Sequence, residues 1–186
     1  TTFTPETAEG TVDVQFTFDG STLAGKTVVV FESVSYEGKE FAVHADLKDE
    51  GQTIYFPEIK TTAKDNVSGN HYAKPEKEIT LIDTVSYQNL IPGKDYTLTG
   101  TLMDKETKKP LEVDGKPITA RTTFTPEKAD GNVELSFTFD ASALRGKIIV
   151  VFESVSYKEK EIAVHADIDD HEQSIYFPEI KTTAKD

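Results

Sequence analysis

A long internal repeat constrains the fold of this chain more than any other feature of its sequence. Residues 1–65 align without a gap on residues 122–186, and 46 of the 65 aligned positions are identical. The offset defines a unit of 121 residues, which is the size of a whole domain and much longer than one repeat of a solenoid. The sequence therefore predicts a window on a tandem array of similar domains.

The repeat also predicts where the domains begin and end. If each unit starts near Pro57, residues 58–178 are one complete copy. Residues 1–57 are then the C-terminal part of a preceding copy, and residues 179–186 are the first strand of a following copy. We expect adjacent repeats of the same protein to be the neighbours of the complete copy.

Local sequence patterns predict strands and tight turns, with no amphipathic helix. Apolar and polar residues alternate in several short runs, at 12–18, 78–87, 95–104, 146–157, 161–167 and 173–180. Asp114-Gly115, between two extended runs, predicts a two-residue hairpin turn. Strands this short, spread over about 120 residues, make an all-β sandwich the expected architecture.

Composition excludes several classes of function. The chain has 33 acidic and 20 basic residues and a net charge of −13, which argues against nucleic acid as a partner. No apolar run approaches the ~20 residues that span a bilayer, so we expect no membrane insertion of this segment. Cysteine is absent, which excludes disulfides and thiolate metal ligands.

The remaining metal-binding residue types do not form a recognisable site. The four histidines lack the spacing of zinc ligands. Acidic runs at 44–51 and 165–172 contain residue types that bind calcium, the second run through Asp167, Asp169 and Asp170. Neither run has the spacing of an EF-hand loop, so solvated acidic turns are expected. We predict no metal and no cofactor.

Two carboxylates stand on strand faces that are otherwise apolar. Residues two apart in a strand share a face. By this rule Asp83 lies between Leu81 and Val85, and Glu153 lies beside Val151. Such acids either reach the rim of a partly buried face or are buried in a pair that shares a proton, because two close carboxylates cannot both ionise.

Several motifs in the same order carry a resemblance to a known family. They are DTVSYQNLIPGKDYTLTGTLMD, TTFTPEKADG, VVFESVSY, a histidine followed by seven residues and a glutamine, and PEIKTTAKD. Together they resemble the VaFE repeat, also called the Thr–Gln ester-bond domain. Domains of this family form the stalks of surface adhesins in Gram-positive bacteria.

The resemblance implies a fold and a set of site residues. The fold is an immunoglobulin-like β-sandwich whose first and last strands become joined by an ester bond that the protein makes itself. Carried onto this sequence, the cross-link joins Thr61 to Gln173, and the assisting residues are Asp83, Glu153 and His165. Asp83 and Glu153 are the acids that strand alternation had placed on apolar faces.

The chemistry of an ester-forming site explains these residue types. A threonine hydroxyl is a weak nucleophile and needs a base, which His165 can supply. A protonated acid pair, Asp83 and Glu153, can polarise the Gln173 amide before ammonia leaves. Because the protein acts once and on itself, we expect it not to be an enzyme in the usual sense.

The preceding copy lacks its own first strands. It carries equivalents of the site residues, namely Glu32, His44 and Gln52, and Thr182 belongs to the following copy. The resemblance implies parallel first and last strands, so joining Thr61 to Gln52 would need the nine-step stretch between them to double back. That stretch reaches at most about 30 Å. We expect Gln52 to keep its amide unless intermolecular strand complementation supplies the missing strands to residues 1–57.

Two functions follow from the sequence. The first is a structural stalk module of an extracellular, cell-wall-anchored adhesin, with the location inferred from the resemblance alone. The alternative is a ligand-binding adhesin module that recognises a host glycan or matrix protein. Near-identical tandem copies and loops poor in aromatic residues favour the stalk.

Overall fold

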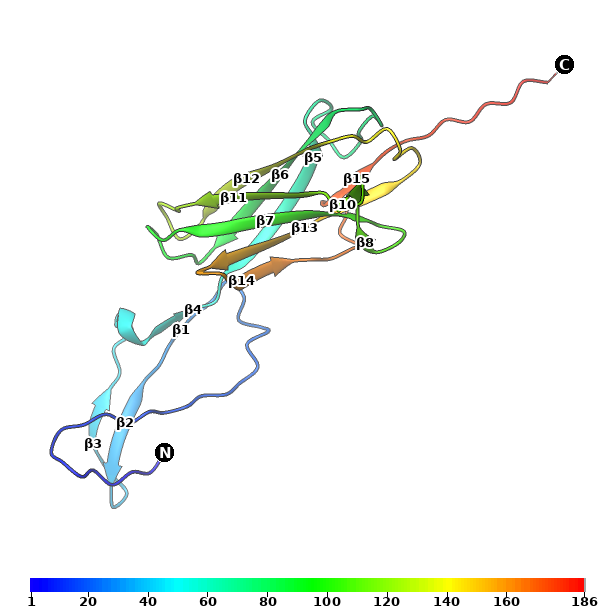
Figure 1. The fold of residues 1–186 in the computed structure, drawn as a ribbon. Helices are drawn as coiled ribbons and strands as arrows, with labels where there is room; N and C mark the ends of the chain where they lie inside the picture. The colour runs from blue at the N-terminus through cyan, green and yellow to red at the C-terminus, as the bar shows by residue number, and fades with distance from the viewer. Residues whose placement is uncertain (186) are drawn as a thin grey trace.

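The computed structural model describes residues 1–185, and residues 57–178 form a two-layer β-sandwich (Figure 1). One layer has the order β12-β6-β5, with β5 at Glu58–Asp65, β6 at Ile79–Gln88 and β12 at Gly131–Phe139. The other has the order β11-β7-β13-β14, with β7 at Tyr96–Asp104, β11 at Thr119–Phe124, β13 at Ile148–Tyr157 and β14 at Lys160–His165. The short strands β15 (Ser174–Tyr176) and β8 (Lys109–Pro110) pair with β13 and β7. The predicted all-β sandwich is confirmed.

Strand alternation places the apolar residues between the layers. In β6 every second residue is buried, and the buried face carries Ile79, Leu81, Asp83 and Val85. The two layers approach closely at Gly100 of β7, where an added Cβ would lie 2.5 Å from atoms of Leu135 and Phe137. A residue without a side chain is therefore required at this point of the core.

The predicted hairpin at Asp114-Gly115 is present. It joins β9 (Glu112–Val113) to β10 (Lys116–Pro117) in antiparallel register. Both turn residues have positive φ angles, 52° at Asp114 and 73° at Gly115, as a type I′ turn requires.

The chain segments that begin and end the sandwich lie side by side and run in the same direction. The Ala63 amide on β5 donates to the Glu172 carbonyl, and the Tyr176 amide on β15 donates to the His71 carbonyl. Tyr72 and Tyr176 form a parallel bridge. The parallel arrangement implied by the resemblance is therefore present.

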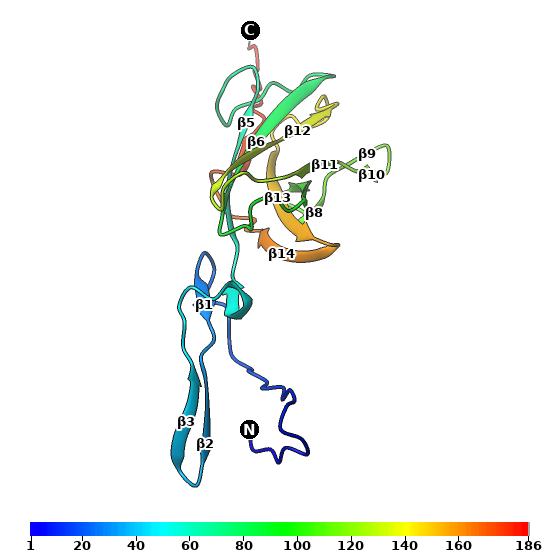
Figure 2. The same cartoon turned by 90° about the vertical axis from the view of Figure 1, so that its left-hand side faces the viewer.

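Residues 1–56 keep only the locally encoded part of the fold. Its elements are β1 (Thr27–Val29), β2 (Glu32–Tyr36), β3 (Lys39–His44), the 3-10 turn η1 (Glu50–Gln52) and β4 (Thr53–Tyr55). The β2–β3 hairpin extends away from the end of the sandwich (Figure 2). It repeats the register of β13–β14 and also its bulge.

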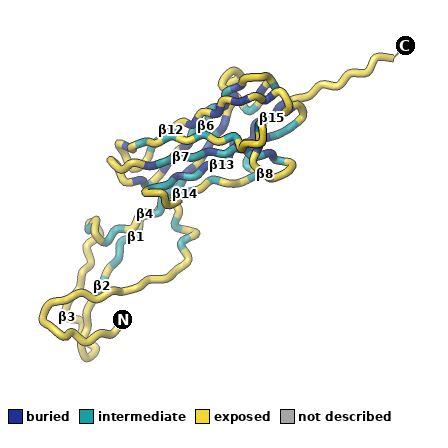
Figure 3. Tube along the Cα trace, viewed as in Figure 1, coloured by how far each residue is buried: buried dark blue, intermediate teal, exposed yellow. Residues whose placement is uncertain are grey.

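The strand predicted at residues 12–18 is not formed. The equivalent segment of the complete copy is β12, which pairs along its whole length with β6. Residues 1–56 have no counterpart of β6, so the same kind of sequence lies exposed, with Phe16 57% and Phe18 56% accessible (Figure 3). The alternating pattern becomes a strand only where a partner strand is available.

Candidate functional site

Four of the predicted site residues lie inside the sandwich. Their side chains come from both layers: Thr61 from β5, Asp83 from β6, Glu153 from β13 and Gln173 from the turn before β15. The fractional exposure is 7% for Thr61, 0% for Asp83, 2% for Glu153 and 0% for Gln173. The structure thus buries four polar side chains in a core that is otherwise mostly apolar.

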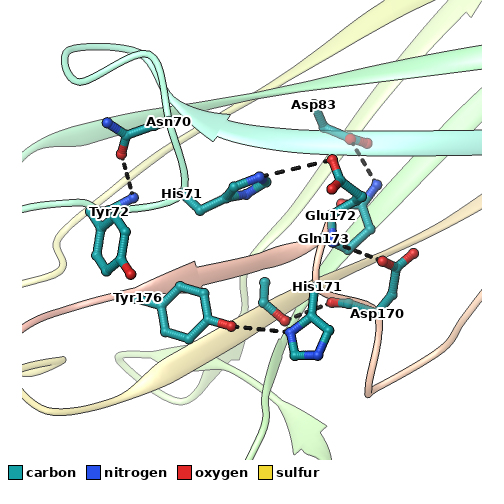
Figure 4. A network of polar contacts seen from close by, with 10 residues as sticks. Asn70, His71, Tyr72, Asp83, Asp170, His171, Glu172, Gln173 and Tyr176 are labelled. Atoms are coloured by element: carbon teal, nitrogen blue, oxygen red, sulfur yellow. Dashed lines mark hydrogen bonds and ion pairs between the residues drawn. The ribbon is translucent and has the colours of Figure 1, made fainter.

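The Gln173 carboxamide is held against Asp83. Gln173 Nε2 donates a 3.1 Å hydrogen bond to Asp83 Oδ1 (Figure 4). The backbone supports this contact, because Ala63 is the register partner of Asp83 and its amide donates to the carbonyl of Glu172, the residue before Gln173. Thr61 lies two residues from Ala63 on the same buried face of β5.

Polar atoms without partners are concentrated at this place. Within residues 1–185, six buried side-chain atoms lack a hydrogen-bond partner, and five of them belong to these four residues. They are Thr61 Oγ1, Asp83 Oδ2, both carboxylate oxygens of Glu153, and Gln173 Oε1. Each such atom costs about 1–3 kcal/mol of stability. This concentration of unpartnered polar atoms marks the four residues as a candidate site.

The two acids have raised pKa values. Burial, and then the negative charge of Asp83, raise the pKa of Glu153 to about 10, and the nearby Thr61 hydroxyl opposes this shift only in part. Burial also raises the pKa of Asp83, while Glu153, Gln173 and His165 act in the opposite direction. Glu153 is consequently a neutral acid at pH 7, next to Asp83 and the Thr61 hydroxyl.

His165 lies at the edge of this group. It is directly opposite Glu153 in the β13–β14 register. Its Nε2 lies 2.7 Å from Asp170 Oδ2, and both side chains are partly buried. If Nε2 carries the hydrogen donated to Asp170, Nδ1 keeps the lone pair that a base needs.

Asp170 is the residue that sequence reasoning did not assign to the site. Its Oδ1 accepts the Glu172 amide at 2.8 Å, and its carbonyl accepts the Ser174 hydroxyl at 2.6 Å. These bonds shape the turn that presents Gln173. Asp170 therefore connects the orientation of His165 to the position of the glutamine.

The repeat contained a signal for this role. In the preceding copy His44 Nε2 lies 2.7 Å from Asp49 Oδ2, and Asp49 also accepts the Gly51 amide and the Thr53 hydroxyl. The same contacts recur at Asp170. A histidine, an aspartate and a glutamine at a constant spacing in both copies mark a locally encoded turn.

The acidic runs form turns, as expected. In the second run the Asp169 amide donates to Asp167 Oδ1. Across residues 1–185, no group of three or more His, Asp or Glu side chains is arranged to hold a metal ion. The structure also has no helix in this range that is long and apolar enough to cross a membrane.

The equivalents of the site residues in the preceding and following copies do not form an enclosed site. Glu32 pairs with His44 in the β2–β3 register, as Glu153 does with His165. Gln52 is half-buried, Glu32 is half-buried and His44 is exposed, because the strands that would enclose them are missing. Thr182 is exposed in the C-terminal segment.

Two consecutive segments of the chain match the same known family. The sequence pattern of the family described as the T-Q ester bond containing domain matches residues 1–56 and again residues 57–177. No curated protein matches the chain.

Solved structures of similar fold include an adhesin from Mobiluncus mulieris that contains intramolecular disulfide, isopeptide and ester bond cross-links, seen in two crystal forms. The TM-scores are 0.56 and 0.55, and the identities are 17% and 19%. The match covers 66% of this chain and 57% of the adhesin chain, so this chain spans little more than half of that protein's length. The two segments that match the family pattern together cover nearly the whole sequence. This chain therefore belongs to the T-Q ester bond domain family.

Proposed function

We propose that residues 58–178 are a stalk module of a cell-surface, cell-wall-anchored adhesin, locked by an ester that the module forms between Thr61 and Gln173. The single observation that carries this proposal is the burial of Thr61, Asp83, Glu153 and Gln173 with five unpartnered polar atoms among them. The family match and the similarity to a cross-linked adhesin support the surface location.

The reaction begins with attack of Thr61 Oγ on the Gln173 side-chain carbonyl carbon. His165 takes the hydroxyl proton through Nδ1, while Asp170 holds Nε2–H. Neutral Glu153 donates to Oε1 of Gln173 as negative charge develops there, and Asp83 orients the amide nitrogen through the 3.1 Å hydrogen bond. Burial excludes the water that would compete with Thr61.

Collapse of the tetrahedral intermediate breaks the bond between the carbonyl carbon and nitrogen. The departing nitrogen takes the proton from His165, so the products are one ester and one molecule of ammonia. No cofactor enters this balance. Strand pairing replaces substrate binding, because it brings the two reacting groups together within one chain.

The bond would join the two strands that carry load. Residue 58 begins β5 at one end of the sandwich, and the chain leaves after β15 toward the other end (Figure 1). Force applied to the termini pulls β5 and β15 in opposite directions. An ester between Thr61 and Gln173 carries that force directly and leaves residues 62–172 unloaded. Closing a loop of this length stabilises the fold by about 4–5 kcal/mol in the chain-entropy model.

Intact mass spectrometry tests the cross-link. The purified protein is expected to weigh less than its sequence by one ammonia, and digestion is expected to yield a Thr61 peptide joined to a Gln173 peptide. Thr61→Ala and Gln173→Ala are expected to restore the full mass. A full-length chain that keeps its sequence mass after long incubation at neutral pH would falsify the assignment.

We also propose that residues 1–57 accept a strand from a second copy of the chain. Val14, Phe16 and Phe18 are exposed, whereas their equivalents in the complete copy are buried on β12. Residues 57–121 of a second copy are already covered by its own residues 122–178, so exchanging them gains no burial. The exposed segment 179–185 repeats the sequence of β5, which lies beside the turn before β15 in the complete copy. It would therefore pair beside residues 51–55, whereas covering Val14, Phe16 and Phe18 needs a counterpart of β6.

Such an association would be head-to-tail, because residues 179–185 of one copy would meet residues 1–57 of another. Sedimentation at increasing concentration should reveal reversible self-association that is lost when residues 179–186 are deleted. Purely monomeric behaviour of the full chain would contradict this proposal. A Thr61–Gln52 link within one monomer would contradict the parallel-strand geometry.

A further inference from the structure

A specific contact joins the complete module to the copy before it. Only Phe56 and Pro57 separate β4 from β5, and β1 and β4 lie at the end of the sandwich (Figure 1). The side chain that bridges the two parts is Asn89, which follows β6. Its Nδ2 donates to the Lys26 carbonyl at 2.7 Å and lies 3.4 Å from the Phe56 carbonyl.

The carboxamide oxygen of Asn89 also makes a hydrogen bond to the preceding copy. Asn89 Oδ1 accepts the Thr27 hydroxyl at 3.0 Å. The backbone of the same residue is held in the complete module, because its amide donates to Asp130 Oδ1 at 2.9 Å. Its φ angle of 65° lies in the left-handed region, which asparagine adopts more readily than most residues. Asn89 is thus fixed to one module and hydrogen-bonded to the other.

The two carbonyls that receive Asn89 Nδ2 recur in the repeat, whereas Thr27 is replaced by Ile148 in the complete copy. In the preceding copy the Gly25 amide donates to the Phe56 carbonyl, and the Phe56 amide donates to the Lys26 carbonyl. At the far end of the complete module the Gly146 amide donates to the Phe177 carbonyl, and the Phe177 amide donates to the Lys147 carbonyl.

The glycine of this turn meets a glutamate in both copies. Gly25 and Gly146 have φ angles of 72° and 73°. A Cβ on Gly25 would lie 3.0 Å from Glu58 Oε2, and a Cβ on Gly146 would lie 3.2 Å from Glu179 Oε2. The same two carbonyls are therefore presented at the same place in each unit.

We propose that Asn89 docks the complete module onto the preceding copy and sets the angle between consecutive modules. A carboxamide side chain suits this position, because its N–H group donates to the Lys26 and Phe56 carbonyls and its oxygen accepts from the Thr27 hydroxyl. This inference deepens the stalk role proposed above, because a stalk with fixed angles transmits force along one line. It does not depend on the ester.

The absence of cysteine allows a direct measurement of the joint. Glu50→Cys in η1 and Glu106→Cys after β7 place spin labels at exposed positions on the two sides of Asn89. Electron–electron double resonance should give one narrow distance distribution for this protein. Asn89→Asp keeps the size and the positive φ but puts an oxygen against the two carbonyls, so the distribution should broaden.

Asn89→Gly is the second test variant, because it keeps the backbone freedom and removes the carboxamide. It should broaden the distribution as Asn89→Asp does. Asn66→Ala is the matched control at the opposite end of β5, where the side chain is exposed, and it should leave the distribution unchanged. An unchanged width in both Asn89 variants overturns the proposal. Intact masses of the same samples report the ester separately.

Discussion

The Gln173 carboxamide donates a hydrogen bond to the Asp83 carboxylate. Gln173 lies in the turn before the last strand of the sandwich, Asp83 lies on the second strand, and the two residues are 90 positions apart in the sequence. The bond occupies the amide nitrogen and leaves the carbonyl oxygen of Gln173 without a donor. The carbonyl of Gln173 is therefore free to accept a hydrogen bond from a neutral acid, and Glu153 is the buried acid with a pKa raised to about 10.

Glu153→Gln should stop or greatly slow ester formation. The glutamine keeps the size of the side chain and still donates a hydrogen bond, but it has no acidic proton to give to the developing oxyanion. Time-resolved intact mass after refolding measures the rate. Complete removal of an oxyanion donor costs about 10²–10³ in rate, and Glu153→Ala, which removes the donor, should show at least a loss of this size. Asp83→Asn should slow the reaction as well, and unchanged rates in both variants would mean that the acids are structural.

His165→Ala should slow the reaction and leave a residual rate if Thr61 loses its proton to water. Asp170→Asn tests the positioning role of Asp170, because asparagine keeps the turn-shaping acceptor but weakens the hold on the imidazole. Its effect should lie between those of the parent and His165→Ala, with a shifted pH profile. Asp169→Asn, which alters a neighbouring exposed carboxylate, is the control. Equal rates and pH profiles for Asp170→Asn and the parent would rule out the positioning role.

Stability of the uncross-linked fold should fall as pH rises. In Thr61→Ala the ester cannot form, and Glu153 keeps a folded-state pKa raised above its unfolded value, because the other causes of the shift remain. The folded state then binds a proton that the unfolded state releases above about pH 4.5. The free energy of unfolding should decrease above that pH and level off above the folded pKa, by at most about 1.4 kcal/mol per pH unit.

Urea titrations between pH 5 and pH 9 measure this slope. The double variant Thr61→Ala/Glu153→Gln should have a flatter profile, since the titrating group has been removed. A rise in stability with pH for the single variant, or identical slopes for the two, would show that Glu153 does not hold the proton.

Gly100→Ala should destabilise the complete module by about 1–3 kcal/mol, because overpacking forces side chains or backbone to move. The added methyl carbon would meet Leu135 and Phe137 at 2.5 Å. Gly100 is also the register partner of Glu153, so wider spacing of the layers should slow ester formation. Gly10→Ala is the control at an open position without positive φ, where an added Cβ has no contact within 4 Å. Equal free energies of unfolding for Gly100→Ala and the parent, measured with denaturant, would contradict the close approach of the two layers.

The sequence alone predicted the fold class, and it named four polar residues that the structure buries inside the sandwich. Alternation in β6 and β13 is a local property, so it placed Asp83 and Glu153 on buried faces before any partner strand was known. The repeat located the domain, and the turn residues Asp114 and Gly115 specified their own hairpin. The His–Asp–Gln turn forms in both copies because its hydrogen bonds span only a few residues.

Tertiary structure decided everything that needs a partner distant in the chain. Residues 12–18 have the pattern of a strand and remain unpaired, whereas the equivalent β12 is formed because β6 lies beside it. The raised pKa of Glu153 and the unpartnered oxygens of the site depend on enclosure by both layers. Asn89 gains its role only when the preceding copy docks against the loop after β6. Burial and long-range pairing are properties of the assembled sandwich, so no short segment of the sequence contains them.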